Sequence, residues 1–255
     1  MSFDLAWLDL REPADRVARD HALLRRAQAH LACVEMPVVV DLGAGSGATV
    51  RAFGGWPPAR WQLVDNDVVL LAEAKRRCGP DVTTLHFDLH DLDALPLSEA
   101  RLVTASALLD LTSAAWIEAL ADRIAALNAG FYATLIYDGC TAWTPVHPDD
   151  VAVTAAFNRH QRRDKGFGPA LGPLAGACVE AAMRSKGYSM CMAASRWSLD
   201  STHAALQREL LAGIANAASE AGSSVAEAWH QKRSDMLPGS SCVVGHVDVL
   251  ALPAG

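Results

Sequence analysis

Short apolar runs alternate along this chain with segments of helical periodicity, and this alternation constrains the fold more than any other feature. The apolar runs lie at 38–40, 61–64, 82–87, 101–105 and 131–137, and helical segments at 48–53, 68–77 and 113–130 lie between them. Strands that alternate with helices form parallel sheets, which are buried on both faces. The sequence therefore predicts an α/β fold, doubly wound, with a mainly parallel sheet and helices on both faces.

The remaining segments extend this pattern at both ends. Residues 11–31 have the periodicity of one helix, and residues 139–172 are rich in proline and glycine around a short predicted helix. Further along we predict a helix at 173–187, a strand at 188–194, a helix capped by Asp200 or Ser201, another helix at 224–233 and a last strand at 243–252. We expect one domain over 1–255, with an N-terminal helical cap at 1–34 and an insertion or lid at 139–172.

Composition limits the partners that the chain is expected to have. The formal net charge of −7 disfavours polyanions such as nucleic acid or an anionic membrane. No window approaches about 18 uncharged apolar residues, so we expect no membrane span. Charges between Asp4 and Asp20 argue against a signal peptide. The six cysteines are scattered and form no C-x-x-C pair, which favours a reduced, cytoplasmic protein without a metal site. The oligomeric state is left open.

A glycine-rich turn follows the first apolar run, with the sequence Asp-Leu-Gly-Ala-Gly-Ser-Gly at 41–47. Such a turn exposes backbone N–H groups to a ligand at the start of a helix. Its G-x-G-x-G spacing differs from the G-x-G-x-x-G of dinucleotide folds. Asp65 ends the next strand, placed to accept hydrogen bonds from ribose hydroxyls, and Asp41 would repel a pyrophosphate. The pattern favours a nucleoside with a cationic far end.

These residues resemble the motifs of class I methyltransferases, which use S-adenosylmethionine (SAM). Residues 41–47 resemble the first motif of that family, 63–67 the acidic second, 87–89 the third and 102–110 the fourth. The resemblance implies a seven-stranded sheet in the order 3-2-1-4-5-7-6 with an antiparallel last strand, and SAM as the cofactor. It implies that Asp88 binds the adenine amino group and that the Leu89 backbone binds a ring nitrogen. The implied cofactor-binding residues are Asp41, Gly43, Ala44, Gly45, Asp65, Asn66, Asp88, Leu89 and Ser106.

The expected reaction is methyl transfer to an oxygen or nitrogen nucleophile of a small molecule. The protein must align the nucleophile with the methyl group and exclude water, and a base is needed only if the nucleophile arrives protonated. The candidate catalytic residues are Asp110 in the fourth motif, His160, whose unperturbed pKa lies near neutrality, and Tyr137 at the end of strand five. Asp138 is interpreted as a turn residue and not as a metal ligand.

Candidate substrate-binding residues lie in the insertion and at the N-terminus. Arg11 and Arg19 are suited to clamp a carboxylate, and the alternative is that they pair with neighbours such as Asp15 on a solvated helix. Segment 158–168 is dense in polar groups and ends in Gly-Phe-Gly, which favours a closing lid; the alternative is a solvated helix end. The other candidates are Trp143, Asn158, Lys165 and Phe167. Trp116 and Trp197 are expected in the core.

Three other functions stay open at this stage. One is a nicotinamide-dependent oxidoreductase, which the glycine spacing and Asp41 disfavour. Another is a protein that binds SAM without turnover. The third is a methyltransferase that acts on RNA or protein, of which the acidic net charge and the insertion, expected to enclose the site, disfavour RNA.

Overall fold

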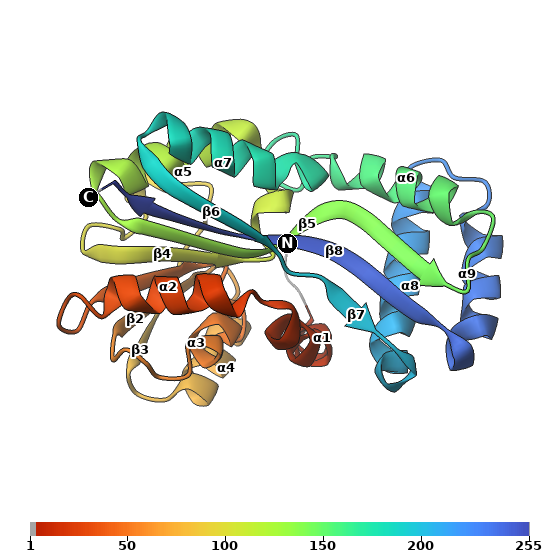
Figure 1. Ribbon diagram of the computed structural model, residues 1–255, viewed down its shortest axis with the longest axis horizontal. Coiled ribbons are helices and arrows are strands. Elements are labelled where there is room, and N and C mark those ends of the chain that lie inside the picture. Colours follow the sequence, from red (N-terminus) through yellow and green to blue (C-terminus); the bar gives the residue numbers. More distant parts are fainter. Residues whose placement is uncertain (1–3, 255) are drawn as a thin grey trace.

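A central sheet of parallel strands with antiparallel strands at one side forms the body of the molecule (Figure 1). The computed structural model describes residues 4–254, so residues 1–3 and 255 of the predicted domain and cap lie outside the described residues. The strands are β1 (Val38–Leu42), β2 (Arg60–Asp65), β3 (Val82–His86), β4 (Ala100–Ser106), β5 (Gly130–Thr144), β6 (Tyr188–Ala194), β7 (Trp197–Leu199) and β8 (Ser241–Pro253). The helices are α1 (Leu5–Ala18), α2 (His21–Leu31), α3 (Ala48–Phe53), α4 (Val68–Cys78), α5 (Ala114–Ala126), α6 (Asp150–Gln161), α7 (Ala175–Ser185), α8 (Ala204–Glu220) and α9 (Ala226–Met236).

The order of the sheet is β3-β2-β1-β4-β5-β8-β6, and the short β7 also pairs with β8. Strands β1 to β5 pair in parallel, whereas β8 runs antiparallel to β5, β6 and β7. The predicted α/β class with an antiparallel last strand is confirmed. The strand number differs, since β7 is an eighth strand and β8 takes the place expected for the seventh.

Helices cover both faces of the sheet because alternate residues of the inner strands point to opposite sides. Val39 packs with the apolar residues of α2, α3 and α4, while its neighbours Val38 and Val40 pack with those of α5 and α7. Leu102 and Val103 of β4 divide in the same way. All five residues are at most 3% exposed, which explains the continuous apolar runs in the sequence.

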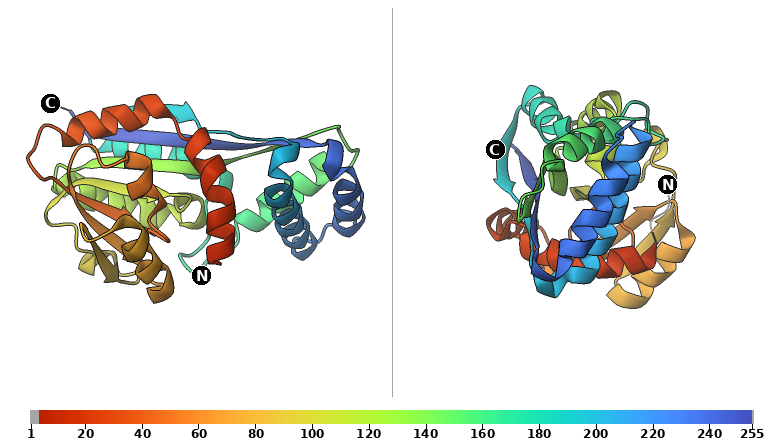
Figure 2. Two further views of the ribbon diagram at one scale, coloured as in Figure 1. Left: turned by 90° about the horizontal axis from the view of Figure 1, so that it is seen from below. Right: turned by 90° about the vertical axis from the view of Figure 1, so that its right-hand side faces the viewer.

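The N-terminal segment forms two helices and not the single helix predicted at 11–31. Asp20 caps α2 by accepting a hydrogen bond from the Leu23 N–H (2.8 Å). The backbone N–H of Asp20 donates to Asp248 on β8 (2.8 Å), so the break is anchored to the sheet. As a result α2 lies along the sheet, whereas α1 stands between the sheet and the helices beyond it (Figure 2).

Strands β5 and β8 continue well past the rest of the sheet, and helices α6, α8 and α9 pack beside this extension (Figures 1 and 2). We call these helices, with the extension and β7, the helical lobe. Strand β5 runs to Thr144, past the end predicted at 137, so the first residues of the predicted insertion at 139–172 belong to this strand. The apolar residues of the lobe form a separate core, which includes Tyr137, Trp143, Val153, Trp197, Leu206, Ile214, Trp229 and Val244.

A buried ion pair anchors α9 to the start of α6. Arg233 pairs with both carboxylate oxygens of Asp150, and it also donates to the Pro145 carbonyl (2.7 Å). The Trp229 indole N–H donates to the same carboxylate (2.8 Å). Since Arg233 is 1% exposed, loss of either charge would leave the other buried and unpaired.

Candidate active site

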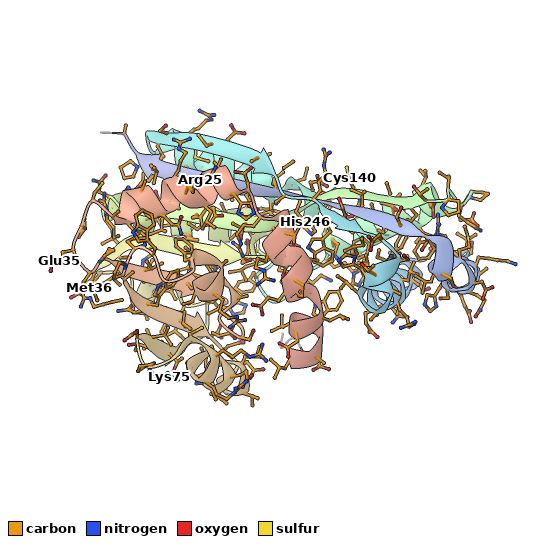
Figure 3. All side chains as sticks on the ribbon, turned by 60° about the horizontal axis from the view of Figure 1, so that its bottom comes forward. Arg25, Glu35, Met36, Lys75, Cys140 and His246 are labelled. Carbon is orange, nitrogen blue, oxygen red and sulfur yellow. The ribbon has the colours of Figure 1, made fainter. Side chains whose placement is uncertain are left out.

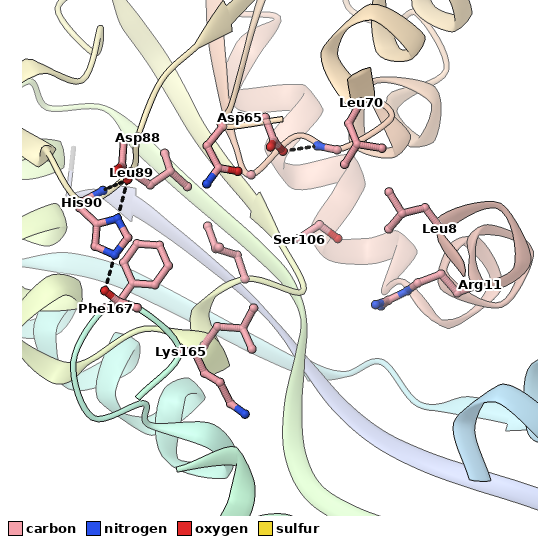
Figure 4. Close-up of a pocket in the computed structure, with 16 residues that line it drawn as sticks. Leu8, Arg11, Asp65, Leu70, Asp88, Leu89, His90, Ser106, Lys165 and Phe167 are labelled. Atoms are coloured by element: carbon pink, nitrogen blue, oxygen red, sulfur yellow. Dashed lines mark hydrogen bonds and ion pairs between the residues drawn. The ribbon is translucent and has the colours of Figure 1, made fainter. Parts of the chain in front are cut away.

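A cavity lies at the carboxyl ends of the parallel strands, where ligands bind in doubly wound folds. Figure 4 shows it surrounded by side chains from α1, from the ends of β2 and β4, and from the loops after β3 and α6. We call it the strand-end cavity. Predicted site residues that line it are Arg11, Gly43, Gly45, Asp65, Asn66, Asp88, Leu89, Ser106, Lys165 and Phe167.

The glycine turn takes a backbone conformation that favours glycine. Gly43 and Gly45 have φ angles of +63° and +52°, and both face the strand-end cavity. The Ala44 N–H donates to the Val64 carbonyl (3.1 Å), which ties the turn to β2. Ala44 is buried and lines a smaller hollow next to the cavity, together with Gly45 and Ser106.

Asp65 links the glycine turn to the start of α4. One carboxylate oxygen accepts the Gly45 N–H (2.8 Å) and the other accepts the Asp67 N–H (3.0 Å). Burial raises the pKa of Asp65 above its usual value, while these hydrogen bonds oppose the shift. Each carboxylate oxygen has two lone pairs, so both retain capacity to accept a ligand hydroxyl.

Asp88 and the loop after α6 close the other end of the cavity (Figure 4). One Asp88 oxygen accepts hydrogen bonds from the backbone N–H (3.0 Å) and the ring Nδ1 (2.5 Å) of His90. The opposite ring nitrogen of His90 contacts the Gly166 carbonyl, and the ring stacks on Phe167 with centroids 4.2 Å apart. Hydrogen bonding to Asp88 raises the pKa of His90. The Gly-Phe-Gly segment therefore lies against the cavity.

Asp41 and Arg19 lie beneath the glycine turn and line none of the cavities described here. Asp41 is 1% exposed and accepts a hydrogen bond from the Thr104 hydroxyl (2.7 Å). Burial raises its pKa to about 6. Arg19 is 4% exposed and donates to Thr134 (2.5 Å) and Ser106 (3.3 Å). Arg19 thus holds the Ser106 hydroxyl, whereas Asp41 is tied to Thr104 on the neighbouring strand β4.

A second cavity of about 140 Å³ lies between α1, α6, α8, the end of β4 and the middle of β5. We call it the inner chamber. It brings together the predicted residues Arg11, Asp110 and Tyr137, which are distant in sequence. Its lining consists of Trp7, Arg11, Ala107, Asp110, Leu135, Tyr137, Thr141, Phe157, Gln161, Trp197, Leu210, Ile214, Val244 and His246.

Two strained residues line the inner chamber. Ala107 follows β4 with a φ angle of +51°, and Leu135 lies in β5 with a φ angle of +56°. The Ala107 N–H donates to the Thr134 carbonyl (2.9 Å), and the Leu135 N–H donates to the Asp248 carboxylate (2.8 Å). Residues other than glycine rarely adopt this conformation, and such strain gathers at functional sites. One of the two residues follows β4 directly and the other lies within the neighbouring strand β5.

Arg11 is the residue that connects the cavities, since it lines both the strand-end cavity and the inner chamber. Its guanidinium pairs with Asp15 (2.8 Å) and lies 5.0 Å from the ring centre of Trp197. The Trp197 indole N–H donates to the same Asp15 carboxylate (2.9 Å). The predicted pairing of Arg11 with Asp15 therefore coexists with a place in the site. Trp197, expected as plain core, also lines the chamber.

Asp110, Tyr137 and His246 in the inner chamber have shifted pKa values. Burial raises the pKa of Asp110 to about 6, and the Arg11 cation opposes that shift. Burial also raises the pKa of Tyr137, so its hydroxyl stays protonated near neutrality, and it donates to Asn158 (2.9 Å). Burial and then the Arg11 cation lower the pKa of His246 to about 4, so its ring is neutral.

A third cavity, about 740 Å³, runs along α1, α6 and α8, and we call it the outer groove. His160 lines this groove and not the inner chamber. Its Nε2–H donates a hydrogen bond to the Glu220 carboxylate (2.9 Å), and its Nδ1 accepts one from the Lys165 ammonium (3.3 Å). Trp143 lies further away, in the lobe core against Trp229, and lines none of these cavities.

His246 and His90 are the residues that the sequence analysis missed. His246 is 6% exposed, and its Nδ1 atom has no hydrogen-bond partner among the described residues. Figure 3 shows it on β8, close to α1. A signal was available, because His246 and Asp248 are polar residues two positions apart in an otherwise apolar strand, hence on one face. His90 had no comparable signal.

Residues 4–254 contain no group of three or more His, Cys, Asp or Glu side chains arranged to hold a metal ion. Within the same range, no helix has the length and apolar character needed to cross a membrane.

No protein-family model matches the sequence, and no curated protein is similar to it in sequence. Solved structures are similar in fold. The YcgJ protein from Bacillus subtilis has a TM-score of 0.54 at 13% identity, over 92% of this chain and 100% of that one. A SAM-dependent methyltransferase from Geobacter sulfurreducens, in complex with S-adenosyl-L-homocysteine, has a TM-score of 0.51 at 16% identity, over the whole of both chains. An O-methyltransferase family protein from Burkholderia thailandensis has a TM-score of 0.51 at 16% identity, over 74% of this chain and 54% of that one. The chain therefore has the class I methyltransferase fold.

Proposed function

We propose that this protein is a SAM-dependent methyltransferase that acts on an oxygen or nitrogen nucleophile of a small molecule. The observation that carries the proposal is the continuity of the site. The glycine turn and the Asp65 carboxylate line one cavity, and Arg11 connects that cavity to a chamber containing Asp110. The fold of solved methyltransferases supports the same conclusion.

The residues of the strand-end cavity fit SAM. The carboxylate of Asp65 suits the ribose hydroxyls, and the free oxygen of Asp88 with the Leu89 backbone suits adenine. Gly43 and Gly45 offer close backbone approach to the methionine part, for which Ser106 supplies a hydroxyl. When bound, SAM supplies a methyl group already activated on a sulfonium.

The protein contributes orientation, a dry environment and a base. Asp110 has a pKa near 6, so at pH 7 most of it is carboxylate that can receive a proton from the nucleophile. Trp7, Phe157 and Trp197 line the inner chamber with apolar rings, which would keep water from the reacting atoms once substrate is bound. We propose Tyr137 as a positioning residue, because Asn158 fixes its hydroxyl.

The N-terminal segment and the loop after α6 lie at the edge of the site. We propose that the N-terminal segment 1–34 caps the site through α1, because Leu8 and Arg11 line the strand-end cavity. The loop after α6 would act as the lid, with Phe167 as its contact. All six cysteines are free thiols, which supports a reduced, cytoplasmic protein. The acidic net charge supports a small-molecule partner over nucleic acid.

The test is calorimetric titration with SAM, S-adenosylhomocysteine and NAD, followed by incubation of cell metabolite extract with radiolabelled SAM. We expect both sulfur nucleosides to bind, NAD to be silent, and a labelled small molecule to form. Tight binding of NAD with silent SAM would replace this proposal by an oxidoreductase. Binding of SAM with no labelled product in any extract would support a SAM-binding protein without turnover.

A further inference from the structure

The inner chamber and the outer groove adjoin one another and share five lining residues. Both are lined by Trp7 of α1, by Phe157 and Gln161 of α6, and by Leu210 and Ile214 of α8. A molecule whose reacting end lies in the chamber therefore has its remaining part directed along the groove. Lys165 and Leu111 line both the groove and the strand-end cavity, so the groove also reaches the proposed cofactor site.

The inner chamber and the outer groove differ in volume, so each suits a different part of a substrate. The chamber, at about 140 Å³, is close to the size of roughly 150 Å³ at which an engineered protein cavity holds one benzene molecule. The groove, at about 740 Å³, lies within the range of roughly 300–1,000 Å³ typical of small-molecule sites. Its floor is largely apolar, with Leu10, Phe157, Leu210 and Ile214 along α1, α6 and α8. A single ring fills the chamber, and an extended apolar body fits the groove.

The charges in the chamber favour an oxygen nucleophile over an amine. Asp110 is the one carboxylate among the described residues that line the chamber, and the Arg11 cation faces both Asp110 and His246. Arg11 is paired with Asp15, which weakens its field at the chamber, but guanidinium N–H groups outside that pair can donate to an oxyanion as it develops. Methyl transfer to an amine instead develops positive charge on nitrogen, which these donors do not stabilise. His246 adds a buried Nδ1 atom that has no hydrogen-bond partner within residues 4–254, and a ligand hydroxyl can supply one.

We propose that the substrate, given the methyltransferase function proposed above, is a hydroxylated single ring that carries an extended apolar substituent. The ring lies in the inner chamber with its hydroxyl between Asp110 and His246, and the substituent lies in the outer groove. In the reaction the oxygen of the ring's hydroxyl group forms a bond to the methyl carbon while the carbon–sulfur bond breaks. The bonding electron pair stays on sulfur, and the hydroxyl proton passes to the Asp110 carboxylate. The products are a methyl ether and S-adenosylhomocysteine.

The first test compares 4-methylphenol with 4-octylphenol, titrated into the protein saturated with S-adenosylhomocysteine. Prior titration of that nucleoside alone tests the proposed function separately. We expect 4-octylphenol to bind at least about tenfold more tightly, because its additional methylene groups leave water for the groove. With radiolabelled SAM we expect 4-octylphenol to give a labelled methyl ether, and 4-octylaniline to give no product.

Gly213 offers a variant that blocks the groove without disturbing the fold. It lies on α8, lines the groove, and a Cβ built there meets no atom within 4 Å. Its replacement also improves helix propensity. Gly213→Phe should lose the preference for 4-octylphenol and keep the affinity for 4-methylphenol. Ala205→Phe is the matched control, because Ala205 is exposed on the same helix and lines no part of the groove.

A second variant tests the chamber. His246→Phe keeps a ring of similar size and removes the unpartnered nitrogen, so it should weaken both phenols and leave the affinity for S-adenosylhomocysteine unchanged. If the nucleoside binds but the two phenols bind equally, or Gly213→Phe leaves the preference intact, the proposed substrate class is wrong and the cofactor assignment stands. Methylation of 4-octylaniline in place of 4-octylphenol would likewise overturn the oxygen assignment. If the nucleoside itself does not bind, the methyltransferase proposal fails first.

Discussion

Replacing Asp65 by alanine is expected to weaken binding of S-adenosylhomocysteine by about 1–3 kcal/mol, which is about 5- to 150-fold in Kd. The magnitude follows from what the carboxylate holds. It accepts the N–H groups of Gly45 and Asp67, and it retains lone pairs for a ribose. Hydrogen bonds to a charged group contribute about 1.5–3 kcal/mol each, and water replaces part of each in the variant. Asp65→Asn keeps one acceptor oxygen, so its Kd should lie between those of the parent and the alanine variant.

Isothermal titration calorimetry measures this change, and circular dichroism establishes that each variant is folded. Asp93→Asn serves as the matched control, because Asp93 is an exposed aspartate outside the cavity and its replacement should leave Kd unchanged. A folded Asp65→Ala protein with the parent's Kd would show that this carboxylate does not contact the nucleoside. The assignment of the second motif would then be wrong, and with it the proposed orientation of the cofactor.

Three further outcomes are expected. Burial raises the pKa of Asp41 from 3.8 to about 6, so the free energy of unfolding falls as pH rises between these values. In urea unfolding, Asp41→Asn should gain up to about 3 kcal/mol in the free energy of unfolding relative to the parent between pH 4 and pH 7. Parallel pH profiles for the two proteins would refute this. Asp150→Ala leaves Arg233 buried and without its carboxylate partner, so the free energy of unfolding should fall by about 3–5 kcal/mol in a denaturant titration. A loss smaller than about 1 kcal/mol would show that the ion pair is not buried in solution. For turnover of 4-octylphenol, kcat/KM should rise with pH through an apparent pKa of about 6, as the Asp110 carboxylate forms. Asp110→Asn should abolish this rise of kcat/KM with pH. If the rise is unchanged in the variant, Asp110 is not the base.

The strand-end cavity was largely predictable because its residues follow a local rule. Parallel neighbouring strands place their carboxyl ends at one edge, so the glycine turn after β1 and Asp65 after β2 had to meet. The hydrogen bond between Gly45 and Asp65 spans only 20 residues. The same rule placed Asp41 among the cofactor-binding residues, but its side chain is buried in the interior. Position at a strand end does not tell whether a side chain faces the cavity or the interior.

The helical lobe and the inner chamber were not predictable in the same way, because distant segments form them. Trp143 packs against Trp229, and Asp150 pairs with Arg233 83 positions later. The break between α1 and α2 depends on a hydrogen bond between Asp20 and Asp248, 228 positions apart. Periodicity reports only the neighbours of a residue along the chain. It therefore located α6, α8 and α9 but not the groove that α6 and α8 form with α1.

Asp248 shows how the fold sets the geometry of the chamber without lining it. One of its oxygens accepts the N–H of Asp20 at the break after α1, and the other accepts the N–H of the strained Leu135. The same buried carboxylate therefore fixes where α1, which carries Arg11, leaves the sheet and how β5 bends at the chamber wall. One carboxylate thus stabilises both the helix break at Asp20 and the strained backbone at Leu135. Hydrogen bonds to a charged acceptor are stronger than those between neutral groups. The position of Arg11 relative to the strand ends is thus set within the core of the sheet, which explains how a helix outside the sheet can supply a precisely placed cation.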